Sequence, residues 1–212
     1  MTTSRSRRLA VLASGKGSNL RALAGHARDA AFGGTIALVV CDRADAGAVG
    51  IARELGLPVE TPATGPLRTR LSADAERAWV ALLRTHGVDT VLLAGFMRVL
   101  HADFLDAFPG HVLNVHPSLL PAFPGVDAIG RAFRHGVRVT GVTVHLVTPR
   151  VDDGPILLQQ AVPVEDHDTL ETLEERVHAA EHALYPEAVH RFLTRPYVVE
   201  GQRLCWREGS HP

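Results

Sequence analysis

The sequence predicts an α/β fold with a mostly parallel sheet, and three observations support this prediction. Short apolar runs alternate along the chain with segments whose apolar residues recur at helical spacing. A glycine-rich turn, Ser14–Asn19, follows the first apolar run, as at the first strand-to-helix turn of many α/β folds. The 212 residues are 46% hydrophobic and 21% charged, which is the composition of a globular chain with a substantial core.

Predicted strands and helices alternate through the first half of the chain. Leu9–Ala13 is predicted to be a buried strand, because it is a continuous apolar run that ends at a glycine-rich turn. Residues 19–32 carry leucine and alanine on one helical face and end before Gly33. The remaining elements predicted here are helices at 46–55 and 72–86, the latter with Ser72 as its N-cap, and strands at 35–41, 59–61 and 90–94.

The middle of the chain combines a short strand with a proline-rich loop. A short helix is predicted at 101–108 and a strand at Val112–His116. Three prolines, Pro117, Pro121 and Pro124, follow within eight residues. Proline lacks a backbone N–H and disfavours helical geometry before it, so this segment is predicted to be an ordered loop rather than a helix.

The last third of the chain departs from the regular alternation. A helix is predicted at 127–135, followed by two strands at 140–146 and 156–164. No helix separates these two strands, which predicts some antiparallel pairing. The final helix is predicted at 169–194, and Pro186 is expected to kink it.

The chain length predicts one domain. The N-terminus is basic, but the apolar stretch after it is too short for a signal peptide. We therefore expect a mobile basic tail at residues 1–7, a single domain at residues 8–195 and a C-terminal tail at residues 196–212.

Charge and cysteine content exclude several classes of protein. Lys and Arg total 22 and Asp and Glu total 23, and this near-neutral balance argues against broad contact with nucleic acid. The two cysteines, Cys41 and Cys205, form no Cys-x-x-Cys pair, which argues against a disulfide scaffold or a cysteine-rich zinc site. No apolar run approaches the roughly 18 residues of a membrane span, so we expect a cytoplasmic protein.

The Ser14–Asn19 turn is a candidate phosphate-binding loop. Backbone N–H groups and the helix dipole face an anion at such a turn, and glycine allows its close approach. Leu20 stands where a Gly-x-Gly-x-x-Gly motif has its third glycine, and the P-loop pattern is also absent, so a dinucleotide enzyme or P-loop NTPase loses support. A tight turn without a ligand is the alternative interpretation.

Asn114 and His116 carry the strongest chemical signal. They lie two residues apart in a predicted strand and therefore project from the same face, while Pro117 favours an extended conformation at His116. Asp152 and Asp153, in a later turn, offer a possible carboxylate partner, which would raise the pKa of His116. A charged imidazole beside an amide forms a good oxyanion clamp. A buried Asn/His pair that only satisfies loop backbone remains the alternative.

These residues belong to a wider resemblance. The chain resembles the folate-dependent phosphoribosylglycinamide formyltransferases of purine synthesis. The resemblance is carried, in order along the chain, by SGKGSN at 14–19, LAGFMRVL at 93–100, LNVHPSLLPAFPG at 113–125, VTVHLVTPRVDDGPILLQ at 142–159 and, more weakly, EHALYP at 181–186. SGKGSN is the more specific motif, because the middle stretches are shared with other formyl-folate enzymes.

The resemblance implies a fold and a set of roles. It implies a seven-stranded sheet with a Rossmann-like N-terminal part, and transfer of the formyl group of 10-formyltetrahydrofolate to the amine of 5'-phosphoribosylglycinamide. It implies Asn114, His116 and Asp152 as catalytic residues, and Gly17, Ser18, Asn19 and Glu181 as residues that bind the ribonucleotide. It implies a folate site formed by Arg70 (or Arg68), Met97, Arg98, Val99, Leu100, Asn114, Thr148, Pro149, Arg150, Val151 and Asp152. The implied partners are small-molecule substrates alone, without metal or nucleic acid, for a monomer or homodimer.

Three details of the family pattern bear on this chain. Leu120–Pro121 matches a bond that is often cis in the family. Asp127-Ala128-Ile129 replaces a segment that commonly contains histidines, and Asp153-Gly154 replaces a commoner Gly-Gly pair. Aspartate adopts a positive φ less easily than glycine, so the second departure bears on the rate rather than on the reaction type.

Rival interpretations come from several classes of protein. His178-Ala-Ala-Glu181-His182 matches a short zinc-peptidase signature, against which an ordinary helix face is the more frequent explanation. A formyltetrahydrofolate deformylase is expected to carry an additional N-terminal domain, and a methionyl-tRNA formyltransferase an additional C-terminal domain with a basic surface. A non-catalytic nucleotide-binding module would keep the Ser14–Asn19 loop but have no need of Asn114, His116 and Asp152 together.

Overall fold

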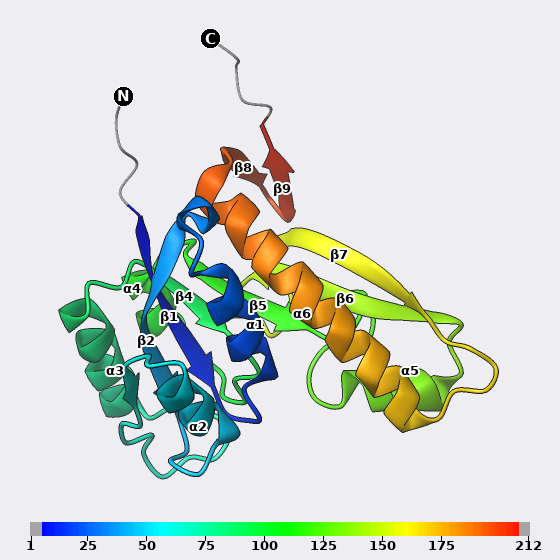
Figure 1. Ribbon diagram of the computed structural model, residues 1–212, viewed down its shortest axis with the longest axis horizontal. Helices are drawn as coiled ribbons and strands as arrows, with labels where there is room; N and C mark the ends of the chain where they lie inside the picture. The colour runs from blue at the N-terminus through cyan, green and yellow to red at the C-terminus, as the bar shows by residue number, and fades with distance from the viewer. Residues whose placement is uncertain (1–5, 208–212) are drawn as a thin grey trace. The chain divides into compact units, whose positions relative to one another are not determined.

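The computed structural model describes residues 6–207 and divides into two compact units, residues 1–113 and 114–212. Each unit is described by itself (Figure 1). Strand β5, Val112–His116, contains the boundary between them. No helix among the described residues is both long enough and apolar enough to cross a membrane.

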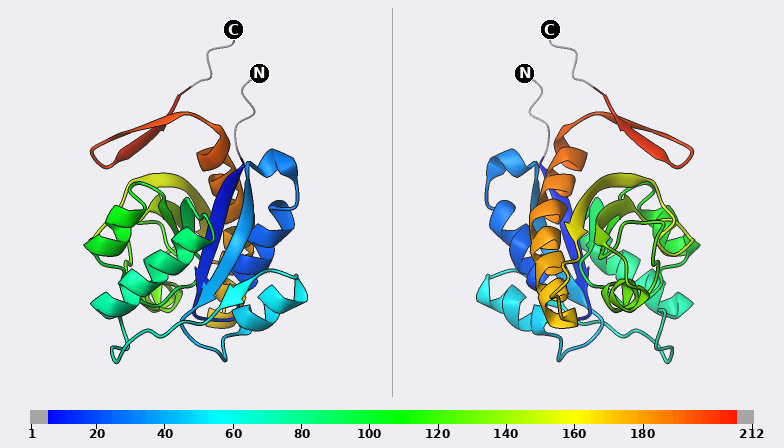
Figure 2. Two further views of the ribbon diagram at one scale, coloured as in Figure 1. Left: turned by 90° about the vertical axis from the view of Figure 1, so that its left-hand side faces the viewer. Right: turned by 90° about the vertical axis from the view of Figure 1, so that its right-hand side faces the viewer.

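The first unit is a Rossmann-like arrangement of parallel strands and helices. Its strands are β1 (Arg7–Ala13), β2 (Gly34–Cys41), β3 (Val59–Glu60) and β4 (Thr90–Leu93), in the parallel order β3-β2-β1-β4. Its helices are α1 (Ser18–His26), α2 (Gly47–Glu54), α3 (Ala73–Thr85) and α4 (Ala102–Ala107), with a 3₁₀ turn at Ala30–Phe32. Helices α1 and α2 cover one face of the sheet and α3 covers the other (Figure 2). Right-handed crossovers require this arrangement when the strand order reverses at β1.

Local sequence explains how these elements begin and pack. Strand β1 is continuously apolar from Leu9 to Ala13, and these five residues are fully buried, as expected for a strand covered on both faces. Ser72 caps α3 as predicted, since its hydroxyl accepts from the Ala75 N–H at 3.3 Å. Trp79 of α3 is completely buried, and its indole N–H donates to the carbonyl of Ala63.

The second unit combines antiparallel strands with one long helix. Its elements after β5 are α5 (Ala128–His135), β6 (Val139–Leu146), β7 (Ile156–Pro163), α6 (Leu170–Thr194), β8 (Tyr197–Glu200) and β9 (Arg203–Trp206). Strands β6 and β7 are antiparallel, as the absence of an intervening helix predicted. Helix α6 packs on both strands and continues through Pro186.

The described residues form nine strands, two more than the seven expected. The additional pair is the β8–β9 hairpin, which lies in the segment expected to be a C-terminal tail. Glu200 pairs with Arg203 across a two-residue turn, and Gly201 in that turn has φ +60°. A glycine turn between two runs of β-forming residues is a hairpin signal, so this hairpin was predictable from the sequence. The α/β class and the mostly parallel sheet of the first unit agree with prediction.

Candidate active site

The Ser14–Asn19 loop of the first unit is shaped by backbone rather than by side chains. Gly17 precedes α1 with φ +82°, and a Cβ there would lie 2.7 Å from the Cα of Ala48. Only glycine fits this position, because it has no Cβ and adopts positive φ without strain. No side chain caps α1, and its first turn contains no acidic residue. The N–H groups at this helix start are arranged as in an anion site.

Helix α2 supports the same loop from its own start. The Ala48 N–H donates to the carbonyl of Gly15 at 3.1 Å, and a Cβ on Gly47 would lie 2.9 Å from the carbonyl oxygen of Lys16. The backbone of Lys16 is therefore held in place, while its side chain is exposed. Lys16 is the single lysine of the sequence. The loop combines a fixed backbone with one mobile positive charge.

The second unit brings the three predicted catalytic residues together. Asp152 Oδ2 lies 3.3 Å from His116 Nδ1, and Asp152 Oδ1 lies 3.5 Å from Asn114 Nδ2. The backbone N–H of Gly125 donates to Asp152 Oδ2 at 2.7 Å. His116 and Asp152 are almost completely buried. Asp152 rather than Asp153 faces the histidine, as the resemblance implied.

Both ring nitrogens of His116 face hydrogen-bond acceptors. Its Nδ1 faces the Asp152 carboxylate, and its Nε2 lies 3.0 Å from the carbonyl oxygen of Phe123. Both of these partners are acceptors, so both ring nitrogens must carry a proton for both contacts to be hydrogen bonds. The geometry therefore suits an imidazolium paired with a carboxylate.

The charge state of Asp152 follows from the same contacts. Burial by itself raises the pKa of Asp152, because it disfavours the charged form. Hydrogen bonds from His145 and the Gly125 N–H, with the charges of His116 and His145, outweigh burial and lower the pKa below its usual value. Asp152 is consequently a carboxylate throughout the neutral range.

His145 of β6 is a member of this cluster that sequence reasoning missed. Its Nε2 lies 3.2 Å from Asn114 Nδ2 and 3.6 Å from Asp152 Oδ1, and its Nδ1 lies 2.8 Å from the carbonyl oxygen of Leu146. With Nδ1 donating to Leu146, the Nε2 of the neutral ring accepts from the Asn114 amide, whereas the Nε2 of the protonated ring donates to Asp152 instead. A lone histidine in an apolar strand gives no signal of its own.

The proline-rich loop beside the cluster is held by polar side chains of β6 and β7. The Thr143 hydroxyl donates to the Ser118 carbonyl at 2.7 Å and accepts from the Leu120 N–H at 3.1 Å. Gln159 donates to the Leu120 carbonyl at 2.9 Å. The Leu120–Pro121 bond is cis, as the resemblance implied. These contacts fix the loop that supplies the Phe123 carbonyl and the Gly125 N–H.

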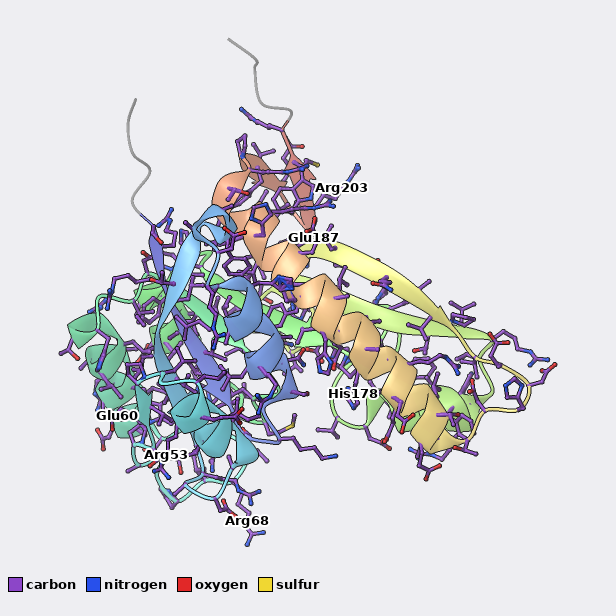
Figure 3. The ribbon with its side chains drawn as sticks, viewed as in Figure 1. Arg53, Glu60, Arg68, His178, Glu187 and Arg203 are labelled. Atoms are coloured by element: carbon purple, nitrogen blue, oxygen red, sulfur yellow. The ribbon has the colours of Figure 1, made fainter. Side chains whose placement is uncertain are left out.

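The predicted folate segments differ in exposure. In the first unit, Met97 is 66% exposed, Val99 is half exposed and Leu100 is buried. The guanidinium of Arg98 is turned inward, where its Nε donates to Asp42 at 2.7 Å. Arg70 is exposed, and its backbone pairs with that of Val99 in an isolated parallel β-bridge. Arg68 is also exposed and points away from the ribbon (Figure 3).

The folate segment of the second unit is the loop before Asp152. The Thr148 hydroxyl donates to the Arg150 carbonyl at 3.2 Å, and Arg150 pairs with Asp153 at 3.6 Å on the surface. Val151 is exposed. Asp152 itself has φ +52°, an unusual conformation for a residue other than glycine. The loop therefore turns Asp152 inward while its neighbours face solvent.

Comparisons with known proteins agree with this geometry. The formyl transferase family matches residues 7–189 of the chain. This chain belongs to the formyl transferase family. It is 42% identical to a phosphoribosylglycinamide formyltransferase of Bacillus subtilis over 187 residues, covering 88% of this chain and 95% of the relative.

Solved structures extend the similarity to the fold. A glycinamide ribonucleotide transformylase from Symbiobacterium toebii is 44% identical, with a TM-score of 0.89 over 95% of this chain and 94% of that chain. A formyltetrahydrofolate deformylase from Pseudomonas syringae also shares the fold, with a TM-score of 0.87 over 96% of this chain and 67% of that chain. Its identity is 23%, which shows the fold alone.

In this formyl transferase, Glu181 is buried on α6 beside His178, which projects from the same helix (Figure 3). His178 Nδ1 lies 2.8 Å from Glu181 Oε2. Burial lowers the pKa of His182, which is also on this helix; Glu181 opposes this effect and His178 adds to it. The His-x-x-Glu-His pattern needs a third ligand for a zinc-peptidase site, and residues 6–207 contain no group of three His, Cys, Asp or Glu side chains placed to hold a metal.

Proposed function

We propose that this formyl transferase transfers the formyl group of 10-formyltetrahydrofolate to the amine of 5'-phosphoribosylglycinamide, in purine biosynthesis. The proposal is supported by the similarity to proteins that carry this name and by the cluster of Asn114, His116 and Asp152. The products are the N-formylated ribonucleotide and tetrahydrofolate.

The chemistry requires stabilisation of a tetrahedral oxyanion. The amine nitrogen attacks the formyl carbon, and negative charge develops on the formyl oxygen. The His116 imidazolium supplies positive charge there, and the amide of Asn114 donates a hydrogen bond. The contact from Asn114 to Asp152 is long, at 3.5 Å, so this N–H can turn to the developing oxyanion. Each such donor contributes a rate factor of about 10²–10³.

Proton transfer completes the reaction without a covalent intermediate on the protein. The new bond joins the amine nitrogen to the formyl carbon, and the bond from that carbon to the folate nitrogen breaks. The proton lost by the amine passes through water to the folate nitrogen. Asp152 keeps His116 charged and serves as the acceptor that relays this proton.

We assign the two substrates to separate groups of residues. Gly17, Ser18 and Asn19 bind the phosphate of the ribonucleotide, and Glu181 contacts its glycinamide end. The folate contacts are proposed at Arg70, Met97 to Leu100 and Thr148 to Asp152, with Arg68 as the alternative to Arg70. Met97 in the first unit and Val151 in the second are exposed apolar side chains, and apolar side chains predominate in small-molecule sites. The proposed partners are these small molecules alone, for a cytoplasmic monomer or homodimer without metal or nucleic acid.

The observation that carries the proposal is the placement of His116 between two acceptors, Asp152 and the Phe123 carbonyl. The experiment is loss of the formyl group from 10-formyltetrahydrofolate, measured with and without 5'-phosphoribosylglycinamide. Wild type should lose the group only when the ribonucleotide is present. His116→Asn should abolish this loss, whereas His167→Asn, at an exposed histidine, should leave it unchanged.

Each other outcome has a definite meaning. Formyl loss without the ribonucleotide would show that water is the acceptor, as in a deformylase. Absence of formyl loss, with the ribonucleotide still bound, would indicate a nucleotide-binding module. Full activity of His116→Asn would show that the cluster does not perform the chemistry.

A further inference from the structure

A buried charge pair lies in the first unit, at the segments proposed to bind folate. Arg98 Nε donates to Asp42 Oδ2 at 2.7 Å, and the two side chains are 12% and 4% exposed. Asp42 follows β2, and Arg98 follows β4, 56 residues later in the sequence. The pair therefore joins two segments that are far apart in the chain.

A second guanidinium nitrogen of Arg98 binds backbone. Its Nη1 donates to the carbonyls of Leu67 and Arg70, the latter at 3.3 Å. The N–H of the next residue, Val99, donates to the carbonyl of Thr69 at 2.9 Å. The segment of residues 67–70 is thus fixed to residues 98–99 by three hydrogen bonds from two successive residues.

The other end of the 97–100 segment is fixed as well. The Met97 N–H donates to the hydroxyl of Ser14 at 2.9 Å, and the Ser14 N–H donates to the carbonyl of Gly95 at 3.1 Å. Ser14 immediately follows β1. Between these anchors, the apolar side chains of Met97 and Val99 are exposed, while the charged side chain of Arg98 is buried. This inverts the usual preference, which places charge in solvent and apolar groups inside.

We propose that Arg98 and Asp42 are positioning residues for the folate co-substrate. Arg98 does not touch folate with its guanidinium; it holds the backbone that presents Arg68, Arg70, Met97 and Val99. This inference rests on the proposed function, since it names folate as the ligand of the positioned segments. The resemblance placed Arg98 in the folate site together with Met97 and Val99. We assign Arg98 the different role of holding the backbone of that segment.

The chemistry of the pair explains why arginine occupies this position. A planar guanidinium donates to a carboxylate and to two carbonyls at the same time, whereas an ammonium is a point charge that cannot span them. Among the described residues, Asp42 Oδ1 has no hydrogen-bond partner, so the carboxylate depends on Arg98. Removing Arg98 leaves a buried, uncompensated charge, which costs more than the pair contributes.

The experiment compares three variants, Arg98→Met, Asp42→Asn and the double variant, with the control Arg53→Met. Arg53 is an exposed arginine of α2 in the same unit (Figure 3). Arg98→Met should raise the KM for 10-formyltetrahydrofolate about tenfold or more, because a small displacement of substrate-binding backbone has a large effect. The KM for the ribonucleotide and kcat should stay within about twofold of wild type. Arg53→Met should change none of these values.

The double variant separates positioning from stability. Adding Asp42→Asn to Arg98→Met removes the unpaired charge, so the midpoint of urea unfolding should recover toward wild type. The KM for folate should stay raised, because the bonds to Leu67 and Arg70 are still absent. Hydrogen exchange of the Val99 backbone amide should be faster than in wild type in Arg98→Met and in the double variant. The backbone amides of β1 should still exchange slowly.

Several results would overturn the inference. A folate KM within twofold of wild type in Arg98→Met, equal rises of both KM values, or recovery of the folate KM in the double variant would each do so. A wild type without ribonucleotide-dependent formyl loss would instead refute the proposed function. Titration of folic acid by calorimetry would then test Arg98 directly, with weaker binding expected in Arg98→Met and equal binding contradicting the role.

Discussion

In the first unit, the Ser14–Asn19 loop presents backbone N–H groups and keeps side chains away from them. In the second unit, the cluster around Asp152 presents side-chain donors around a buried carboxylate. The loop depends on the missing Cβ of Gly17, which leaves room for Ala48. The cluster depends on charged atoms, since Asp152 faces His116, His145 and the Gly125 N–H.

This difference determines which substitutions damage each region. An added methyl group should disrupt the loop, because its shape depends on the close approach of backbone at Gly17. An isosteric change that removes charge should disrupt the cluster, because its contacts converge on the Asp152 carboxylate.

Asp152→Asn should have the largest effect. The side chain keeps its size, but the amide cannot stabilise the His116 imidazolium or accept a proton. We expect kcat to fall by about 10³–10⁴-fold, comparable with the loss of a buried orienting carboxylate in other enzymes. The matched control is Asp106→Asn, which makes the same change at an exposed aspartate of α4. Formyl transfer is measured for both variants. Activity within tenfold of wild type would show that the cluster does not depend on this charge.

Gly17→Ala should damage the loop through shape alone. The new Cβ would lie 2.7 Å from backbone of α2, at a residue with φ +82°. We expect destabilisation of about 1–3 kcal/mol and a higher KM for the ribonucleotide. Gly25→Ala is the control in the same helix, because nothing lies within 4 Å of its Cβ and its φ is not positive. That change should stabilise the protein by up to about 1 kcal/mol. Stability is measured by urea unfolding, and KM by substrate kinetics, for both variants. Equal effects of Gly17→Ala and Gly25→Ala would show that the loop does not depend on the missing Cβ of Gly17.

The sequence predicted the cluster only in part, for physical reasons. Alternation along β5 placed Asn114 and His116 on one face, because local strand geometry determines side-chain direction. His145 reaches the cluster only through the long-range packing of β6, which local spacing does not encode. The inward turn of Arg98 depends on Asp42, which is 56 residues away. Both omissions concern side-chain partners rather than elements.

The fold could be predicted from the sequence more completely than the contacts within the site. Apolar runs and terminal glycines predicted β1 to β7 and the other helices to within two residues, because these patterns reflect burial of each element. The helix predicted at 19–32 instead ends at His26 and is followed by a separate 3₁₀ turn at Ala30–Phe32. The β8–β9 hairpin was missed although Gly201 lies at its turn. The prediction of a tail at residues 196–212 overlooked this glycine turn, which is a local hairpin signal.

The pH dependence of stability should distinguish the cluster from the loop. The folded pKa of Asp152 is lowered, so its charge stabilises the folded state above its unfolded value of 3.8. That contribution is lost as the pH falls below 3.8 toward the folded pKa. The difference in unfolding free energy between wild type and Asp152→Asn should therefore shrink as the pH falls below 3.8. The difference for Gly17→Ala should not follow this course, since no titrating group is involved.

Thiol labelling should give the smallest effect and follow the two units separately. Cys41 ends β2 and is completely buried, and burial, with the charge of Asp42, raises its pKa to about 11. At pH 8 about one Cys41 in a thousand is then a thiolate, whereas Cys205 of β9 is partly exposed. A disulfide reagent should label Cys205 rapidly and Cys41 only when the first unit opens. Gly17→Ala should accelerate labelling of Cys41, because it destabilises that unit, and Asp152→Asn should leave it unchanged. Equal acceleration by both variants would show that the two regions open together, and the contrast between them would then concern chemistry but not stability.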